Sequence, residues 1–243
     1  MRMAFVSAVW GMVLGGGAVV WGAQAGGTAD AKKGPVCQVQ ACKEKGQTCP
    51  MKSEFDKKKG WICLFNGKDL TGWKPRPDRQ GKNCWRVENG ELINDLKPGE
   101  HGIDLITERK FEDFMLHIEF KVPKNGNSGV YLRGHIEVQV HDSFGQRPAM
   151  HTCGSLYSKK VADKVASKKA GEWQCFNITI RGNKVTVYHN GEKIIDAFDC
   201  PGPTGGELDG QNFGKPGPIM LQGDHTAVSY RNIWIKPLKG KNP

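Results

Sequence analysis

The chain has 243 residues, of which 38% are hydrophobic and 25% charged, and its 35 basic and 25 acidic side chains give a formal charge of +10. This length and composition exclude a chain that is disordered throughout and a disulfide-stabilised miniprotein, because about 200 residues bury a sizeable core unaided. The basic excess favours anionic surfaces at low salt but specifies no partner.

The first 25 residues have the pattern of an export signal. Arg2 precedes an apolar run from Met3 to Trp21, and Ala23-Gln24-Ala25 is a small-x-small cleavage site. We therefore expect cleavage after Ala25, export to the periplasm, cell surface or exterior, and no stable membrane insertion afterwards. The alternative is an uncleaved anchor, because the run approaches the roughly 20 residues that span a bilayer.

Residues 26–59 form a lysine-rich segment with few apolar residues, which we interpret as a solvated linker. Eight lysines against four acidic residues supply +4 of the net charge. The segment lacks the interleaved aromatic residues that would stack on bases, so we expect no nucleic-acid partner.

The cysteines are expected to form disulfides after export. They are Cys37, Cys42, Cys49, Cys63, Cys84, Cys153, Cys175 and Cys200. The alternative, a metal site, is less consistent with the sequence, because it contains no C-x-x-C pair. The sequence does not select which cysteines pair.

From Gly60 onward, apolar and polar residues alternate with the period of two that is typical of strands. The clearest predicted strands are 114–122, 128–133, 136–141, 176–181 and 184–189. Asn-Gly dipeptides predict tight hairpin turns at 66–67, 89–90, 125–126 and 190–191. Residues 159–170 permit a helix but lack an apolar stripe, so we expect a surface loop or a short helix there. Many short strands, each with one apolar face, predict an all-β sandwich of two antiparallel sheets.

Several motifs resemble, in the same order, those of the 3-keto-disaccharide hydrolase family. GWICLFNGKDLTGW (60–73) is similar to its opening signature and YRNIWIKPL (230–238) to its ending. Between them lie NSGVYLR (127–133), EVQV (137–140), GEWQ (171–174), HNG (189–191) and two proline-glycine segments (201–206 and 216–222). The resemblance covers residues 60–238, which leaves 1–25 as a signal peptide, 26–59 as a separate segment and 239–243 as a tail.

The resemblance implies a concanavalin A-like jelly roll that cleaves 3-keto-glycosides, by hydrolysis or by lyase and hydratase steps. A ketone at C3 acidifies the C2 hydrogen, so that a base forms an enolate that expels the C1 substituent. Water added across the resulting double bond completes net hydrolysis. This chemistry requires a base, a group that stabilises the enolate oxygen, and an acid for the leaving group.

The family motifs and strand alternation together indicate the site residues. Glu137, the carboxylate of the EVQV motif, is the expected base or metal ligand, His225 the expected acid, and Arg133 the group that stabilises the enolate. The expected substrate contacts are Gln139, Asp142, Glu119, Asn177 and Gln222. One divalent metal ion is expected to assist, with His141 as a second ligand beside Glu137. No nucleotide cofactor is expected.

The segment around His225 departs from the family pattern. Relatives have Gln-Asp-His-Gly, whereas here Gly223 is inserted after Gln222 and Thr226 replaces the glycine. We therefore expect a different loop geometry. His141 also stands where relatives often have an aliphatic residue, which adds a potential ligand.

Two other functions fit the sequence. Jelly rolls include carbohydrate-binding modules as well as enzymes, so sugar binding without turnover is one alternative. The other is a glycosidase acting on unoxidised glycans, which requires two carboxyl groups about 5 to 10 Å apart, and Glu119 and Glu137 are the expected pair. Trp61, Trp73, Trp173 and Trp234 are expected mainly in the core, with at most one against a sugar. The sequence does not specify an oligomeric state.

Overall fold

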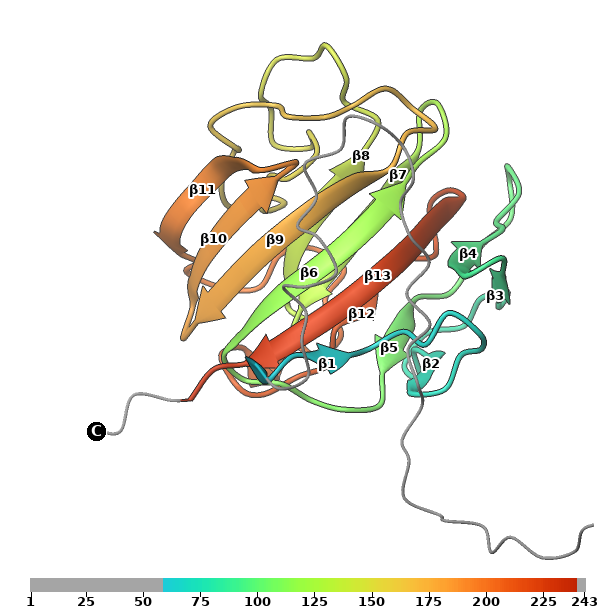
Figure 1. The fold of residues 1–243 in the computed structure, drawn as a ribbon, viewed down its shortest axis with the longest axis horizontal. Helices are drawn as coiled ribbons and strands as arrows, with labels where there is room; N and C mark the ends of the chain where they lie inside the picture. Colours follow the sequence, from blue (N-terminus) through green and yellow to red (C-terminus); the bar gives the residue numbers. More distant parts are fainter. Residues whose placement is uncertain (1–58, 240–243) are drawn as a thin grey trace, which may run out of the picture. The chain divides into compact units, whose positions relative to one another are not determined.

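The computed structural model describes residues 59–239. The expected signal peptide therefore lies outside the described residues. Of the lysine-rich segment only Lys59 is described, and of the expected tail only Lys239. The described chain is an all-β sandwich of two antiparallel sheets (Figure 1). No helix among residues 59–239 has the length and apolarity that a bilayer crossing requires.

The larger sheet has eight strands, and β6 and β13 lie at its centre. Its strand order is β11 (Glu192–Asp199), β10 (Lys184–His189), β9 (Gln174–Arg181), β6 (Phe114–Lys121), β13 (Val228–Pro237), β4 (Glu91–Asn94) and β3 (Trp85–Glu88), with β1 (Ile62–Cys63) paired to β13.

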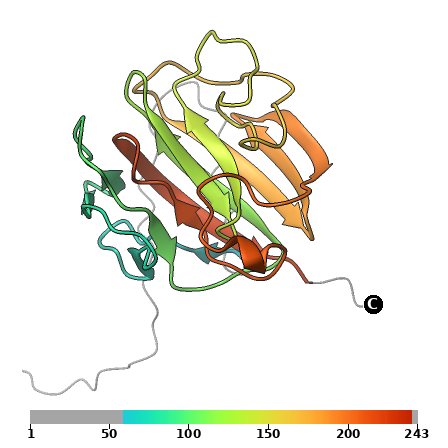
Figure 2. The ribbon, with the colours of Figure 1, turned by 180° about the vertical axis from the view of Figure 1, so that it is seen from behind.

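The smaller sheet has five strands, in the order β2 (Trp73–Pro75), β5 (Leu105–Thr107), β12 (Met220–Leu221), β7 (Asn127–Leu132) and β8 (Ile136–His141). Figure 2, seen from behind, shows β7 and β8 in yellow-green on the near side. A short 3-10 turn, Gly210–Asn212, lies in the segment that leads to β12.

From β4 to β7, successive strands alternate between the two sheets, as in a jelly roll. β4 and β6 lie in the larger sheet, whereas β5 and β7 lie in the smaller one. The inward residues of both sheets therefore meet in one core, where Ile118, Phe120, Val130 and Val138 have no exposed surface. The predicted all-β jelly-roll sandwich of two antiparallel sheets is confirmed.

Two of the four Asn-Gly dipeptides form the predicted hairpin turns. Asn89-Gly90 joins β3 to β4 and Asn190-Gly191 joins β10 to β11, with positive φ at both residues of each pair. The prediction is wrong for residues 66–67 and 125–126, because the strands that they connect belong to different sheets. Residues 159–170 form a loop without a helix, one of the two predicted alternatives.

The disulfide prediction is wrong for four of the cysteines. Cys84, Cys153, Cys175 and Cys200 are free thiols, and the last three are buried, where a thiol packs as a small apolar group. Cys63 is disulfide-bonded. The three cysteines before it in the chain lie outside the described residues.

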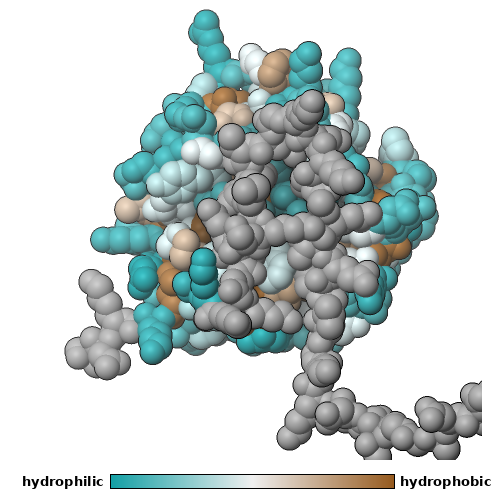
Figure 3. Space-filling view, viewed as in Figure 1, coloured by the Kyte–Doolittle hydropathy of each residue, from teal (hydrophilic) through white to brown (hydrophobic). Residues whose placement is uncertain are grey.

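The described surface has few large apolar side chains. On the face that Figure 3 shows, the visible described surface is mainly hydrophilic, and its hydrophobic patches are small and separate. Met115, Phe144, Met150, Tyr157 and Tyr188 are the large hydrophobic side chains that are exposed among residues 59–239. Three of them, Phe144, Met150 and Tyr157, belong to the long loop between β8 and β9.

Candidate active site

The outward face of the smaller sheet holds a polar cleft of about 490 Å³. Val130 of β7 and Val138 of β8 are paired and point into the core, so the adjacent Tyr131, Glu137 and Gln139 point outward. These three side chains line the cleft, together with residues of the 205–206 turn and of the loop 222–226. Strand alternation therefore placed Glu137 and Gln139 on the face that the structure shows.

Glu137 is the buried carboxyl group of this cleft, with only 3% of its surface exposed. Burial raises its pKa to about 7, Asp224 and Asp104 act in the same direction, and the Tyr131 hydroxyl and His225 oppose them. At neutral pH Glu137 is therefore ionised in a large share of the molecules, and its carboxylate is more basic than that of an ordinary glutamate. These are the properties of a general base.

The hydroxyl of Tyr131 lies between two oxygens. It is 2.9 Å from Oε2 of Glu137 and 2.8 Å from the carbonyl oxygen of Gly205. A phenol has one proton, so it does not donate fully to both at once. When Glu137 is protonated, Glu137 donates to Tyr131 and Tyr131 donates to Gly205, and every group has a partner. The arrangement thus accommodates the carboxyl group after it has accepted a proton.

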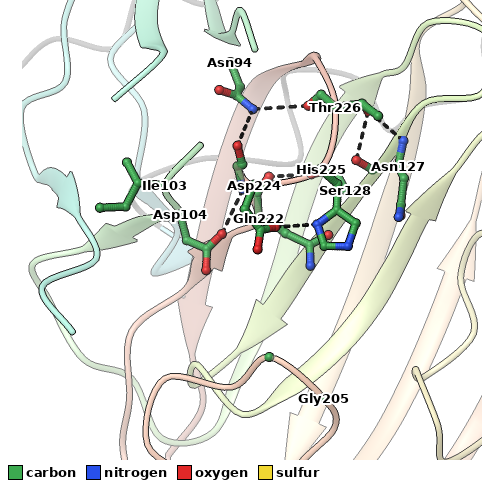
Figure 4. A network of polar contacts seen from close by, with 12 residues as sticks. Asn94, Ile103, Asp104, Asn127, Ser128, Gly205, Gln222, Asp224, His225 and Thr226 are labelled. Carbon is green, nitrogen blue, oxygen red and sulfur yellow. Dashed lines mark hydrogen bonds and ion pairs between the residues drawn. The ribbon is translucent and has the colours of Figure 1, made fainter. Parts of the chain in front are cut away.

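The loop 222–226 is held by hydrogen bonds to neighbouring segments (Figure 4). The inserted Gly223 donates its N–H to Oδ1 of Asp104 at 2.9 Å, and its carbonyl oxygen accepts from Nδ2 of Asn94 at 3.0 Å. The Thr226 hydroxyl accepts the N–H of Asn127 at 2.8 Å and lies 3.0 Å from the carbonyl oxygen of that residue. Both departures from the family pattern therefore contribute hydrogen bonds that fix the loop.

His225 lines the same cleft as Glu137. Its Nδ1 pairs with Oδ1 of Asp224, and this hydrogen bond is the main cause that raises the pKa of the imidazole, against the effect of burial. Asp224 also lies 3.7 Å from Nη1 of Arg79. The cleft thus combines a carboxyl group made more basic with an imidazole whose pKa Asp224 raises, which is a usable base and acid.

Three amide side chains give the cleft unused acceptors. The side-chain oxygens of Asn127, Gln139 and Gln222 are buried and have no hydrogen-bond partner among the described residues, and all three residues line the cleft. A buried acceptor without a partner is costly unless water or a ligand donates to it. Sugar hydroxyls are suitable donors.

Arg133 does not reach the cleft, contrary to the sequence prediction. β7 ends at Leu132, and Arg133 has a left-handed φ of 57° that breaks the alternation. Its guanidinium donates to the carbonyl oxygens of Gly214, at 3.0 Å, and of Gly182. It lines a second cavity, of about 540 Å³, instead. The predicted role at the enolate oxygen therefore does not fit its position.

Glu119 and Asn177 lie in the larger sheet, on β6 and β9, and also do not join the cleft. Glu119 accepts from Nε of Arg231 at 2.6 Å and from Nδ2 of Asn232 at 2.8 Å. The adjacent Ile118 points into the core, so Glu119 points outward from the larger sheet. Glu137 points outward from the smaller sheet, on the opposite side of the sandwich. The predicted carboxyl pair of a two-carboxylate glycosidase is therefore wrong.

Of two further predicted residues, Asp142 and His141, only His141 lines the cleft. The Asp142 carboxylate accepts the N–H of Asn125 at 3.0 Å and does not line the cleft. His141 does line it, and its Nδ1 is 3.0 Å from Oγ of Ser143. Burial and the neighbouring His151 lower the pKa of His141, which favours the neutral imidazole that a metal ligand requires. Among residues 59–239, however, no group of three or more His, Cys, Asp or Glu side chains is arranged to hold a metal ion.

The sequence prediction omitted several residues of the cleft. Tyr131 and Asn127 lie in the NSGVYLR motif at positions that alternate with the inward-facing Val130. The alternation along this strand could therefore have predicted both as outward-facing residues. His151 and Tyr157 come from an irregular loop, where no period indicates a face. None of the four candidate tryptophans lines the cleft, and Trp73, Trp173 and Trp234 are at most 7% exposed.

Jelly-roll sandwiches include lectin domains, and an outward cleft with unused acceptors suits the hydroxyl groups of a sugar. Comparison with known families gives the narrower assignment. Residues 60–236 match the 3-keto-alpha-glucoside-1,2-lyase-like domain, and the chain belongs to this family.

Individual relatives agree with this assignment. The chain is 29% identical to a 3-keto-disaccharide hydrolase of Bacteroides thetaiotaomicron over an alignment of 234 residues, which covers 74% of this chain and 79% of the relative. A crystal structure of a candidate glycosyl hydrolase of Parabacteroides distasonis is 32% identical, with a TM-score of 0.60, and the match covers 74% of this chain and 84% of that one. A second such protein of the same organism is 23% identical, with a TM-score of 0.59 over 80% of this chain and 100% of its own, and shows the fold alone.

Proposed function

We propose that this protein cleaves the glycosidic bond of 3-keto-glucosides and that Glu137 begins the reaction by removing the C2 proton. Membership of the family supports a hydrolase or lyase acting on 3-keto sugars. The proposed role of Glu137 as the base rests on its buried carboxyl group, with a pKa of about 7, in the same cleft as His225.

In the first step the C2–H bond breaks, its proton goes to Glu137, and its electron pair forms an enolate with the charge on O3. The enolate collapses to the C3 ketone and a C1=C2 double bond, and the C1–O bond breaks. The leaving oxygen takes a proton from His225, whose Nε2 is free to donate because Nδ1 pairs with Asp224. Water then adds at C1, Glu137 returns a proton to C2, and His225 accepts the proton from water, which completes net hydrolysis.

The charge on O3 needs donors other than Arg133. The side-chain amides of Gln139 and Gln222 and the guanidinium of Arg79 line the cleft and carry N–H groups. Preorganised donors of this kind lower the barrier most where charge develops in the transition state. We assign the stabilisation of O3 to this set.

A divalent ion held by Glu137 and His141 stays a prediction. Their carboxylate and imidazole suit such an ion, but further ligands would have to include the amide oxygens of Asn127, Gln139 or Gln222. An ion bound there would supply positive charge to an enolate oxygen. Turnover that resists EDTA and does not respond to added divalent ions would argue against it.

The test of the function compares a 3-keto-glucoside with its unoxidised parent. Wild type is expected to release the aglycone from the keto sugar alone. Glu137→Gln is expected to lower kcat/KM by about 10² to 10⁴, the usual contribution of a general base. This variant is expected to fold normally, because burial already disfavours the charged form that it removes. Glu112→Gln, at an exposed position outside the cleft, is the matched control and is expected to retain full activity.

Two results would overturn the proposal. Full activity of Glu137→Gln would remove Glu137 as the base. Binding of either sugar without turnover, with or without divalent ions, would indicate a carbohydrate-binding module instead. Export remains a separate prediction, and a mature N-terminus at Gly26 in protein recovered from outside the cytoplasm would establish it.

A further inference from the structure

Residues 154–157 extend the smaller sheet beyond its edge strand β8. The N–H of Gly154 donates to the carbonyl oxygen of Gln139 at 2.8 Å, and the N–H of Tyr157 donates to the carbonyl oxygen of Glu137 at 3.2 Å. Leu156 is bridged antiparallel to Val138, and both side chains are buried in the core. The next residues along, Tyr157 and Glu137, therefore form a cross-strand pair on the outward face.

Tyr157 is the exposed tyrosine of the cleft. Its exposed fraction is 39%, compared with 1% for Tyr131, whose hydroxyl is bonded to Glu137. The Tyr157 hydroxyl makes no hydrogen bond with the described residues. Its ring lies against Gly205, where a Cβ would stand 3.1 Å from the ring carbon Cε1. The 205–206 turn thus supports the ring while part of its surface stays open to a ligand.

The cleft is polar farther along β8 from Glu137. Gln139 and His141 follow Glu137 in the outward row of β8, and Asn127 lies opposite His141 on β7. Gln139 and Asn127 carry two of the unused amide oxygens. A sugar ring bearing hydroxyl groups fits this polar part, whereas the Tyr157 side offers an aromatic surface.

We propose that Tyr157 is the platform on which an aromatic leaving group of the glycoside packs, so that it selects aryl 3-keto-glucosides. The proposal rests on the proposed function. Glu137 must reach C2, and the leaving group is attached to the adjacent C1, so it lies within a few ångströms of Glu137. With the hydroxyl-bearing ring over Gln139 and Asn127, Tyr157 is the exposed aromatic surface beside Glu137 on which the C1 substituent can pack. Aromatic rings gain from stacking in addition to the area that they bury.

The experiment compares two substrates that share the 3-keto-glucosyl group and anomer but differ at C1: a 4-nitrophenyl and a methyl 3-keto-glucoside. Tyr157→Ala is expected to lower kcat/KM about tenfold for the aryl substrate and less than about twofold for the methyl substrate. Tyr157→Phe keeps the ring and is expected to retain wild-type values for both. Phe144→Ala removes an aromatic residue that is 54% exposed in the same loop but does not line the cleft, and it is expected to change neither.

Equal losses on both substrates would overturn the proposal, because the ring would then not distinguish leaving groups. A loss in Tyr157→Phe as large as in Tyr157→Ala would also overturn it, since the hydroxyl would then be the important group. If wild type cleaves neither substrate, the proposed function fails. Calorimetric binding of the unoxidised 4-nitrophenyl and methyl glucosides then tests separately whether Tyr157 binds an aromatic group. Tighter aryl binding that Tyr157→Ala abolishes would support it, and equal affinities would overturn it.

Discussion

Gly129 of β7 leaves the space that the Glu137 carboxyl group of β8 occupies. A Cβ at Gly129 would lie 2.4 Å from Oε1 of Glu137 and 2.9 Å from its carboxyl carbon. The carboxyl group can therefore lie across the neighbouring strand, within hydrogen-bond distance of Tyr131, only because residue 129 is glycine. The glycine of the NSGVYLR motif thus sets the position of the proposed base.

Gly129→Ala is expected to displace the Glu137 carboxyl group and to reduce kcat/KM on a 3-keto-glucoside about 100-fold, because a shift of about 1 Å misaligns a base. Overpacking is expected to lower the free energy of unfolding by about 1 to 3 kcal/mol. Steady-state kinetics and urea denaturation measure both effects. Gly202→Ala is the matched control, because a Cβ there meets no atom within 4 Å. Wild-type kinetics in Gly129→Ala would show that this orientation of Glu137 is not required.

Tyr131→Phe is expected to move the acidic limb of the pH profile of kcat/KM to higher pH. The Tyr131 hydroxyl stabilises the ionised form of Glu137 and so opposes the effect of burial on its pKa. Removing the hydroxyl raises that pKa further above about 7, so less base is ionised at a given pH. The loss of activity is then larger at pH 6 than at pH 8.

The control for this change is Tyr188→Phe, which alters an exposed tyrosine of β10 in the larger sheet. Its pH profile is expected to match that of wild type. An acidic limb that stays in place in Tyr131→Phe, with a uniform loss at all pH values, would mean that a group other than Glu137 titrates in that limb.

The alternation of residues along the strands predicted some of the side chains that line the candidate cleft but not all of them. Alternation correctly placed Glu137 and Gln139 on one face, because β8 is regular over its whole length. It failed at Arg133, where the strand has already ended and φ is positive. It also failed at Glu119 and Asn177, since parity gives the face of a strand within its own sheet but not which sheet the strand joins.

The walls of the cleft were less predictable for a different reason. The 205–206 turn and residues 154–157 are positioned by hydrogen bonds to β7 and β8 that connect distant parts of the sequence, such as that from Tyr131 to Gly205. No local period or turn signal encodes such contacts. The proposed leaving-group platform, Tyr157, therefore becomes visible only in the folded chain.

Glu119 is expected to make folding stability depend on acidic pH. Burial alone would raise the pKa of its carboxyl group, but hydrogen bonds from His117, Asn232 and Arg231 lower it to about 2, from an ordinary 4.5. A group with a lowered pKa stabilises the fold above its unfolded pKa and loses that effect as the pH falls toward the folded value. At about 1.4 kcal/mol per pKa unit, the contribution is at most about 3.5 kcal/mol.

Urea denaturation of wild type and Glu119→Gln between pH 6 and pH 3 measures this contribution. The difference in the free energy of unfolding is expected to be largest at pH 6 and to shrink steadily below about pH 4.5. Glu112→Gln, at an exposed position, is expected to show no such trend. A difference that stays constant over this range would mean that Glu119 has an ordinary pKa in the folded protein.

Gly223→Ala is expected to damage both the fold and the site. A Cβ at Gly223 would lie 2.2 Å from the carbonyl oxygen of Ile103 and 2.8 Å from Nε1 of Trp85. Those two atoms are themselves hydrogen-bonded at 2.7 Å, so neither moves freely. The added methyl group must therefore push the loop 222–226 away from Asp104, which holds the N–H of Gly223.

This displacement is expected to lower the free energy of unfolding by more than about 2 kcal/mol, as overpacking against backbone does. It also moves His225 out of line with Glu137, so kcat/KM on a 3-keto-glucoside is expected to fall even at temperatures where the variant stays folded. Gly202→Ala again serves as the control, because its Cβ has open space. A variant with wild-type stability but reduced activity would place the effect on His225 alone. Wild-type values for both would show that the inserted glycine is not needed for the close approach to Ile103.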